Sequence, residues 1–269
     1  MQADPGATFR ALHRPGTPFV MPNPWDLGTA KLLKARGAQA LGTTSAGLAF
    51  ALGRRDGDGV TRDRHLAHAQ AIHAATGLPV SGDFENGYGD APEDCAETVR
   101  LAAEAGLAGI GIEDTALPGT APYPFELAVE RIRAAAAAAR ALPRDFVLTA
   151  RSDVVLLGTH GPDEAIRRLL AFAEAGADCL YAPMPGDIDA MRRLCAQTAL
   201  PVNILVIGAY QHLSLTDLGQ LGAARLSLGS TLMRRAARAL DDAAQAVLSG
   251  DFSPLAEGLP FATLDPMLE

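Results

Sequence analysis

The sequence predicts an α/β fold of the (β/α)8 TIM-barrel type. Short apolar runs recur along the 269 residues at intervals of a few tens of residues, and helical patterns lie between them. Such runs are typical of buried parallel strands. Three of them lead directly into polar, mostly charged clusters, and the carboxyl ends of the strands are where an α/β barrel forms its active site. These three segments are 80–87, 110–115 and 147–153.

About eight strands are predicted, and repeated β-α units without a break in composition favour one closed barrel domain over residues 1–269. The alternative is a doubly wound open sheet. It is disfavoured because no Gly-x-Gly-x-x-Gly sequence follows the first strand. The predicted strands are 18–24, 38–45, 79–85, 108–114, 145–152, 177–183, 201–207 and 224–229.

The segments between these strands carry helix signals. Asp26 can cap a helix, and Pro92 and Pro162 each stand in the first turn of another. The alanine run 134–139 is most simply a helix, because alanine is the strongest helix former. Three predicted helices end in a glycine that suits a left-handed C-cap. These glycines are Gly37, Gly106 and Gly176.

Composition excludes several classes of function. The net charge of -8 and the pI of about 5.2 argue against binding to nucleic acid or to an anionic membrane surface. No apolar stretch is long enough to span a bilayer, and residues 1–10 do not resemble a signal peptide. Cys95, Cys179 and Cys195 show no paired spacing, so we expect reduced buried thiols in a cytoplasmic protein rather than disulfides or a zinc site.

Carboxylates at successive strand ends predict a metal site. Asp83 and Glu85 are two residues apart and share one face if the strand continues, and Glu113 ends the next strand. Such oxygen ligands suit Mg²⁺ or Mn²⁺. The alternative is that these acids cap helix N-termini or pair with arginines. The candidate arginines are Arg54, Arg55 and Arg151.

Arg151 ends the fifth predicted strand and is a candidate for binding the substrate. Its planar guanidinium can bind a carboxylate or phosphonate with two parallel hydrogen bonds. The alternative role is a salt bridge to Glu113 or Asp153. Small residues end the second strand, where their backbone N–H groups can face a substrate oxygen. They are Ser45, Ala46 and Gly47.

Together these segments resemble the isocitrate lyase and phosphoenolpyruvate mutase superfamily. The resemblance implies a (β/α)8 barrel that binds a 2-oxo acid or its enolate with Mg²⁺ at its mouth. It also implies that a C-terminal helix is exchanged between subunits, within a tetramer of such dimers. Segment 231–269 would supply this helix and an arm, although the tail could instead fold on its own barrel. The motifs are Asn23-Pro24-Trp25-Asp26, Thr43-Thr44-Ser45-Ala46-Gly47, Leu52-Gly53-Arg54-Arg55-Asp56, Asp83-Phe84-Glu85-Asn86-Gly87-Tyr88-Gly89, Gly111-Ile112-Glu113-Asp114, Ala150-Arg151-Ser152-Asp153 and Gly176-Ala177-Asp178.

By position, the resemblance assigns roles to these residues. Asp83 would be the most direct metal ligand, and metal-bound waters would be held by Glu85, Glu113 and Asp56. Arg151 would bind the substrate carboxylate. The oxo-acid head would lie against small residues of the second strand end, and we place two further residues beside the substrate. These substrate contacts are Ser45, Ala46, Gly47, Trp25 and Asn203.

The chain departs from the superfamily pattern in the loop after the fourth strand. The lyases carry a Lys-Cys-Gly-His type motif there, whose cysteine is the acid-base residue, but loop 116–125 contains no Lys, Cys or His. The loop's one candidate proton donor is Tyr123. Glu85 also stands where the superfamily favours an aspartate, and Pro183 where the lyases commonly have a glutamate.

These residues predict a Mg²⁺-dependent carbon-carbon lyase for small 2-oxo or 2-hydroxy di- or tricarboxylic acids. Decarboxylation of an oxaloacetate-type acid is favoured, because a metal can stabilise the enolate and the proton can come from water or Tyr123. Cleavage of a 2-hydroxy acid needs a base, such as metal-bound hydroxide or Asp56. The alternatives are phosphorus-carbon chemistry on phosphonopyruvate, and a protein that binds a 2-oxo acid without turnover.

Overall fold

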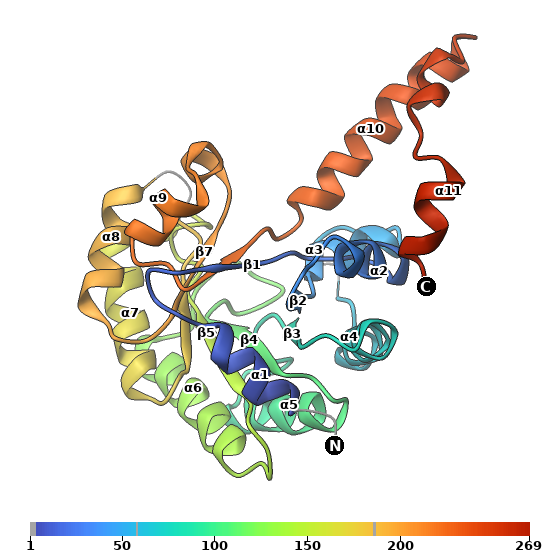
Figure 1. Ribbon diagram of the computed structural model, residues 1–269. Coiled ribbons are helices and arrows are strands. Elements are labelled where there is room, and N and C mark those ends of the chain that lie inside the picture. The colour runs from blue at the N-terminus through green and yellow to red at the C-terminus, as the bar shows by residue number, and fades with distance from the viewer. Residues whose placement is uncertain (1–3, 58, 185–186) are drawn as a thin grey trace.

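Eight parallel strands form a nearly closed barrel in the computed structural model, which describes residues 4–57, 59–184 and 187–269 (Figure 1). The strand order is β1-β8-β7-β6-β5-β4-β3-β2, so β1 and β2 flank the seam. There the Gly42 N–H donates a hydrogen bond to the Pro22 carbonyl oxygen at 3.1 Å. The predicted (β/α)8 barrel is therefore confirmed.

The strands are shorter than the sequence predicts, although each lies within its predicted segment. The second strand differs most, because Thr44 caps a helix that begins at Ser45 and the expected strand 38–45 retains two residues. The strands are β1 (Phe19–Met21), β2 (Leu41–Gly42), β3 (Val80–Asp83), β4 (Gly109–Glu113), β5 (Val147–Arg151), β6 (Cys179–Tyr181), β7 (Val202–Leu205) and β8 (Arg225–Ser227).

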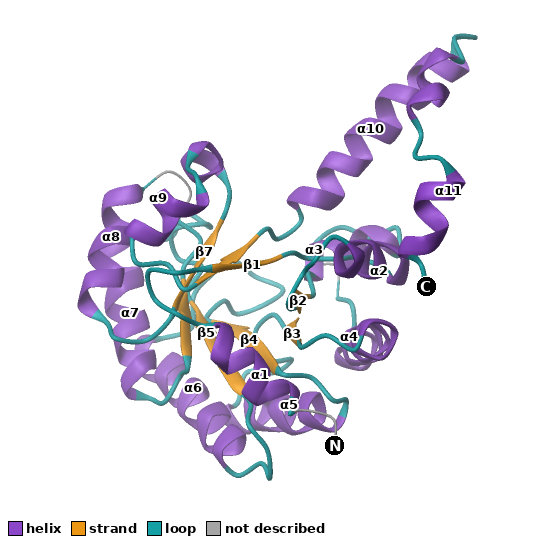
Figure 2. Cartoon of the chain, in the orientation of Figure 1, coloured by secondary structure: helices purple, strands orange, loops and turns teal. Residues whose placement is uncertain are grey.

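Helices surround the strands on the outside of the barrel (Figure 2). Asp26 caps α2 through the Thr29 N–H as predicted, and Pro92 and Pro162 begin α5 and α7. The helices are α1 (Pro5–Leu12), α2 (Leu27–Ala35), α3 (Ser45–Ala51), α4 (Arg62–Thr76), α5 (Pro92–Glu104), α6 (Phe125–Arg140), α7 (Pro162–Glu174), α8 (Ile188–Gln197), α9 (Leu215–Gln220), α10 (Thr231–Leu248) and α11 (Phe261–Leu264).

The three predicted C-cap glycines adopt the left-handed conformation. The φ angles of Gly37, Gly106 and Gly176 are 91°, 85° and 105°, a region that a residue with a Cβ atom rarely occupies. Each glycine thus ends a helix and turns the chain into the following strand. Cys95 and Cys179 are buried and Cys195 is partly buried, and all three are free thiols, as expected.

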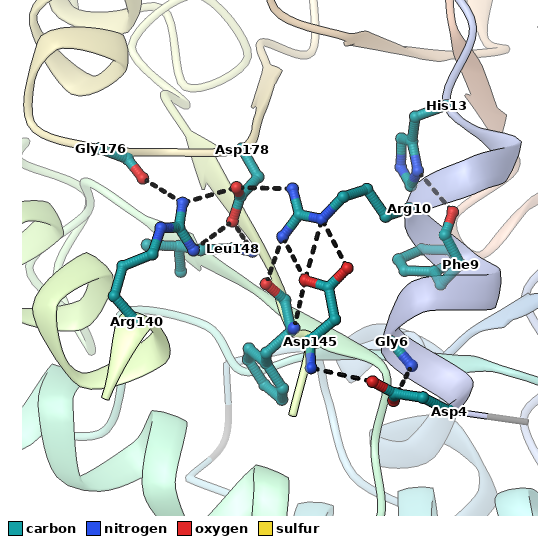
Figure 3. Close-up of polar contacts among 11 residues, drawn as sticks. Asp4, Gly6, Phe9, Arg10, His13, Arg140, Asp145, Leu148, Gly176 and Asp178 are labelled. Atoms are coloured by element: carbon teal, nitrogen blue, oxygen red, sulfur yellow. Dashed lines mark hydrogen bonds and ion pairs between the residues drawn. The ribbon is translucent and has the colours of Figure 1, made fainter. Parts of the chain in front are cut away.

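Helix α1 closes the amino-terminal end of the barrel. Phe9 is fully buried against Phe19 and the inner residues of neighbouring strands. Beside it, Arg10 forms ion pairs with Asp145, shortly before β5, and with Asp178, directly before β6 (Figure 3). Its Nη2 lies 2.7 Å from Asp145 Oδ1 and its Nη1 lies 2.8 Å from Asp178 Oδ1. This ion network links α1 to the starts of β5 and β6.

Helix α10 projects away from the barrel, and the chain returns through α11 (Figure 1). Along α10 only Met233 is buried. The tail then ends beside α2, where Lys31 Nζ donates a hydrogen bond to the Leu268 carbonyl oxygen. The end of the tail therefore lies on its own barrel, while α10 does not. Over the described ranges, none of the helices has the length and apolarity needed to cross a membrane.

We expect Asp178→Ala to lower the free energy of unfolding by about 2–4 kcal/mol. The Asp178 side chain is 7% exposed, and it accepts hydrogen bonds from Arg10, Arg140 and the buried Leu148 N–H. Asp145→Ala is the control and should cost about 1 kcal/mol, because the Asp145 side chain is 29% exposed. Urea unfolding followed by circular dichroism measures both; equal losses would contradict the dominant role of Asp178.

Candidate active site

A cavity of about 80 Å³ opens at the carboxyl ends of the strands, and every strand contributes to its wall. Alternate residues of a strand point to the same side, so the strand register decides which side chains face the barrel interior. Glu113, Arg151 and Tyr181 are partners in neighbouring strands, and Tyr181 is in turn the partner of Asn203. The cavity wall includes Met21, Gly42, Asp83, Glu113, Arg151, Tyr181, Asn203 and Ser227.

Five of the residues predicted for the site line this cavity. They are Asp83, Glu85, Glu113, Arg151 and Asn203. The other predicted residues lie outside its wall. They are Trp25, Ser45, Ala46, Gly47, Asp56 and Tyr123. The roles of both groups remain predictions, but the structure brings together the residues assigned to the metal and to the substrate carboxylate.

Arg151 forms ion pairs with three carboxylates at the barrel mouth. Its Nε and Nη2 lie 2.5 and 2.6 Å from the two carboxylate oxygens of Asp153. Its Nη1 lies 3.3 Å from Glu113 Oε2 and 3.8 Å from Asp83 Oδ1. Burial lowers the pKa of Arg151, but Asp153 and Glu113 outweigh this effect and raise it well above its usual value. The alternative salt bridges are therefore present, and Nη1 points toward the acids assigned to the metal.

The carboxylates of the cavity carry more negative charge than Arg151 can offset. Burial, with the charges of Asp83 and Asp56, raises the pKa of Glu85 to about 7. Burial also raises the pKa of Glu113 well above its usual value, against the opposing effect of Arg151. A cation beside these two carboxylates would lower their pKa values and so keep both groups ionised. This excess of oxygen ligands fits Mg²⁺ or Mn²⁺.

The acids do not form a complete coordination shell. Within residues 4–57, 59–184 and 187–269, no group of three or more His, Cys, Asp and Glu side chains is arranged to hold a metal ion. Mg²⁺ does not require such a group, because it keeps several waters and takes one or two carboxylates together with substrate oxygens. The acids therefore fit Mg²⁺ held by few direct ligands, and the assignment of Asp83 as the direct ligand remains a prediction.

Asp83 is fixed by the end of the second strand. Its Oδ2 accepts a hydrogen bond from the Ser45 N–H at 2.8 Å, and its own N–H donates to Thr43 Oγ1 at 2.8 Å. Ser45 is the first residue of α3, whose N-terminal N–H groups need acceptors. A Cβ atom added to Gly47 would lie 2.6 Å from Thr44 Cγ2 and 3.0 Å from Trp25 Cβ, so a larger residue would crowd both side chains. Ser45 thus orients Asp83, while Gly47 makes room for Thr44 and Trp25.

Tyr123 and Asp56, the predicted acid-base residues, lie away from the cavity wall. Tyr123 is 4% exposed, and its hydroxyl donates to Asp90 Oδ1 at 2.6 Å and accepts from Asn86 Nδ2 at 2.8 Å. Burial and the hydrogen bond to Asp90 raise the pKa of Tyr123 to about 12. Asp56 lies on an exposed loop, where partial desolvation and the charge of Asp83 raise its pKa.

The sequence analysis named Asn203 but missed the other polar residues deep in the barrel. Arg225 Nε donates to Asn203 Oδ1 at 2.9 Å, and its Nη2 donates to Thr149 Oγ1 at 3.1 Å. Asn203 Nδ2 then donates to Ser227 Oγ at 2.8 Å. Burial raises the pKa of Tyr181 to about 12, partly opposed by Arg151 and by a hydrogen bond to Ser227. The alternation of Arg225 and Ser227 within an apolar run was the available signal.

Comparison with known proteins identifies the family. The family model described as phosphoenolpyruvate phosphomutase matches residues 9–248. The chain belongs to the phosphoenolpyruvate phosphomutase family. The resemblance to the isocitrate lyase and phosphoenolpyruvate mutase superfamily is thereby confirmed.

The relatives of this chain include enzymes with named activities. The chain is 32% identical over 215 residues to 2-methylisocitrate lyase of Escherichia coli K12, an alignment covering 76% of this chain and 71% of the lyase. It is 36% identical over 268 residues to the uncharacterized protein Rv1998c of Mycobacterium tuberculosis H37Rv, covering 97% and 96%. A crystal structure of a possible lyase or mutase from Burkholderia cenocepacia J2315 superposes with a TM-score of 0.93 at 46% identity, covering 98% and 95%.

Asp83→Ala should weaken Mn²⁺ or Mg²⁺ binding by more than 100-fold, because it removes the carboxylate assigned as the direct ligand. Asp56→Ala is the matched control and should cost about 10-fold, since Asp56 would act only through a metal-bound water. Isothermal titration calorimetry measures both affinities without requiring turnover. Unchanged affinity in Asp83→Ala would mean that the metal site lies elsewhere.

Proposed function

We propose that this chain is a Mg²⁺-dependent carbon-carbon lyase for small 2-oxo or 2-hydroxy di- or tricarboxylic acids, with oxaloacetate-type decarboxylation as the favoured reaction. The observation that supports it most is the placing of Arg151 Nη1 beside Glu113 and Asp83 within one cavity. A cation bound beside a guanidinium would favour an anionic substrate that can bind to the cation and to the guanidinium at once. The identity to a 2-methylisocitrate lyase supports the same substrate class.

Different residues would bind the metal and the substrate. Asp83 would hold Mg²⁺ directly, with Glu85 and Glu113 acting through waters. When bound, the cation would polarise the 2-oxo group and stabilise negative charge on its oxygen. Arg151 would bind a substrate carboxylate through Nη1 while Asp153 keeps its guanidinium plane fixed. The volume of the cavity, about 80 Å³, is enough for several waters and therefore for a small acid.

Decarboxylation is favoured because the described cavity wall contains no Lys, Cys or His. Loss of CO₂ from a β-oxo acid needs charge stabilisation and a later proton, whereas cleavage of a 2-hydroxy acid also needs a base for the hydroxyl. Phosphorus-carbon chemistry is less favoured, since loop 116–125 offers no cationic side chain for a phosphoryl group.

The first test is product release from four acids with and without Mg²⁺. We expect pyruvate and CO₂ from oxaloacetate, with less or no product from isocitrate, methylisocitrate and phosphonopyruvate, and a loss of at least 100-fold on chelation. Arg151→Lys should raise the KM at least 10-fold, because an ammonium group cannot replace the planar guanidinium. Phosphate release without CO₂ would contradict the proposal, and binding of the acids without turnover would favour a binding protein.

We also propose that the partner of this chain is a second copy that exchanges α10 with it, while the end of the tail at Leu268 stays on its own α2. Apolar side chains are exposed along α10 and the following arm in an isolated chain, including Leu240 at 69%, Phe252 at 64% and Phe261 at 76%. Exposed apolar surface of this extent is typical of a protein interface. A helix that packs on another subunit would bury it.

Leu240→Asp combined with Phe252→Asp should convert the assembly to monomers, because each charge would be buried in the proposed interface. Analytical ultracentrifugation measures the mass. Leu215→Asp is the control, since Leu215 is 53% exposed on α9 and should leave the mass unchanged. A wild-type chain that sediments as a monomer would overturn the proposal.

A further inference from the structure

We propose that Tyr181, and not Tyr123, delivers the proton that completes the reaction. The inference rests on the proposed function and names the donor that the loop after β4 lacks. Tyr181 is the last residue of β6 and lines the cavity together with Asp83, Glu113 and Arg151. Tyr123 lies outside the cavity wall, with its hydroxyl bonded to Asp90 and Asn86.

The strand register places Tyr181 beside the substrate-binding arginine. Tyr181 is the partner of Arg151 on one side and of Asn203 on the other, so their side chains share the inner face of the barrel. The Arg151 guanidinium carbon lies 5.1 Å from the centre of the Tyr181 ring. An acid bound by Arg151 would therefore lie beside the Tyr181 phenol inside the barrel.

The other hydroxyl groups of the described cavity wall are poorer donors. The aliphatic hydroxyl groups are much weaker acids than a phenol. Several of these hydroxyls are also engaged as acceptors: Thr43 by the Asp83 N–H, Thr149 by Arg225, and Ser227 by Asn203. Tyr181 is the one phenol in this wall.

The chemical step balances without a further reactant. Loss of CO₂ breaks the bond between C3 and the departing carboxylate, and its electron pair becomes the double bond of the enolate. The Tyr181 proton then passes to C3, and the electron pair of the O–H bond remains on the phenolate oxygen. Arg151 stabilises this phenolate through its nearby positive charge, and a solvent proton restores the phenol.

Stereochemistry tests this role directly. The probe is 3-methyl-2-oxobutanedioate in D₂O, with the 2-oxobutanoate product reduced at once and stereospecifically to 2-hydroxybutanoate for NMR. A fixed donor delivers deuterium to one face of C3, whereas solvent delivers it to both. We expect one-face labelling from the wild type and from the matched control Tyr123→Phe. Tyr181→Phe should label both faces equally in the product that it releases, since the fixed donor is then absent and solvent supplies the deuterium.

One-face labelling by Tyr181→Phe would overturn the inference. Oxalate binding by calorimetry, within about threefold of the wild-type affinity, shows that the variant retains its pocket. If Tyr181→Phe does not fold, Tyr181→Leu takes its place: it also removes the phenol from the cavity wall and should give labelling of both faces, and one-face labelling by it would count against the role. Wild-type CO₂ release with both faces labelled would overturn the Tyr181 role alone. A wild type that releases CO₂ from no acid would overturn the proposed function as well.

Discussion

Four carboxylates meet the Arg151 guanidinium at the mouth of the barrel or stand close to it. Asp153 takes its two parallel hydrogen bonds, Glu113 and Asp83 lie near its third nitrogen, and Glu85 shares the same cavity. One buried cation can stabilise one close carboxylate well, but not four. Burial, and after it the remaining negative charge, raises the pKa values of Glu85 and Glu113. The cavity therefore holds more carboxylates than Arg151 can neutralise, which fits the divalent cation that we propose.

A second arginine, deeper in the barrel, has the opposite environment. Arg225 is 2% exposed, and its contacts are with the uncharged side chains of Asn203, Thr149 and His13. His13 stays neutral, because burial and the Arg225 charge lower its pKa to about 3. The cavity thus has an acidic rim and a basic floor.

The fold and the acidic rim could be predicted because both leave a strong pattern in the sequence. Apolar runs with charge at their carboxyl ends place Asp83, Glu113 and Arg151 at one edge whatever the precise strand length. Interior positions leave a weaker signal. Tyr181 follows two apolar residues and is easily assigned to the core, although the register turns it into the cavity. Tyr123 was predicted from its loop, but long-range contacts to Asn86 and Asp90 decide where its hydroxyl lies.

The contacts of Asp114 explain how the loop after β4 contributes to the site although it lacks the acid-base residue of the lyases. The Asp114 carbonyl accepts the Tyr123 N–H at 2.8 Å, which ties the end of the loop to the end of β4. The Asp114 carboxylate accepts from Ser152 Oγ at 2.7 Å and from the Asp153 N–H at 3.0 Å. Asp114 thereby fixes the segment whose carboxylate orients Arg151. In this chain the region after β4 thus fixes Asp153, which pairs with Arg151, and the proton donor that we propose, Tyr181, lies in the barrel wall.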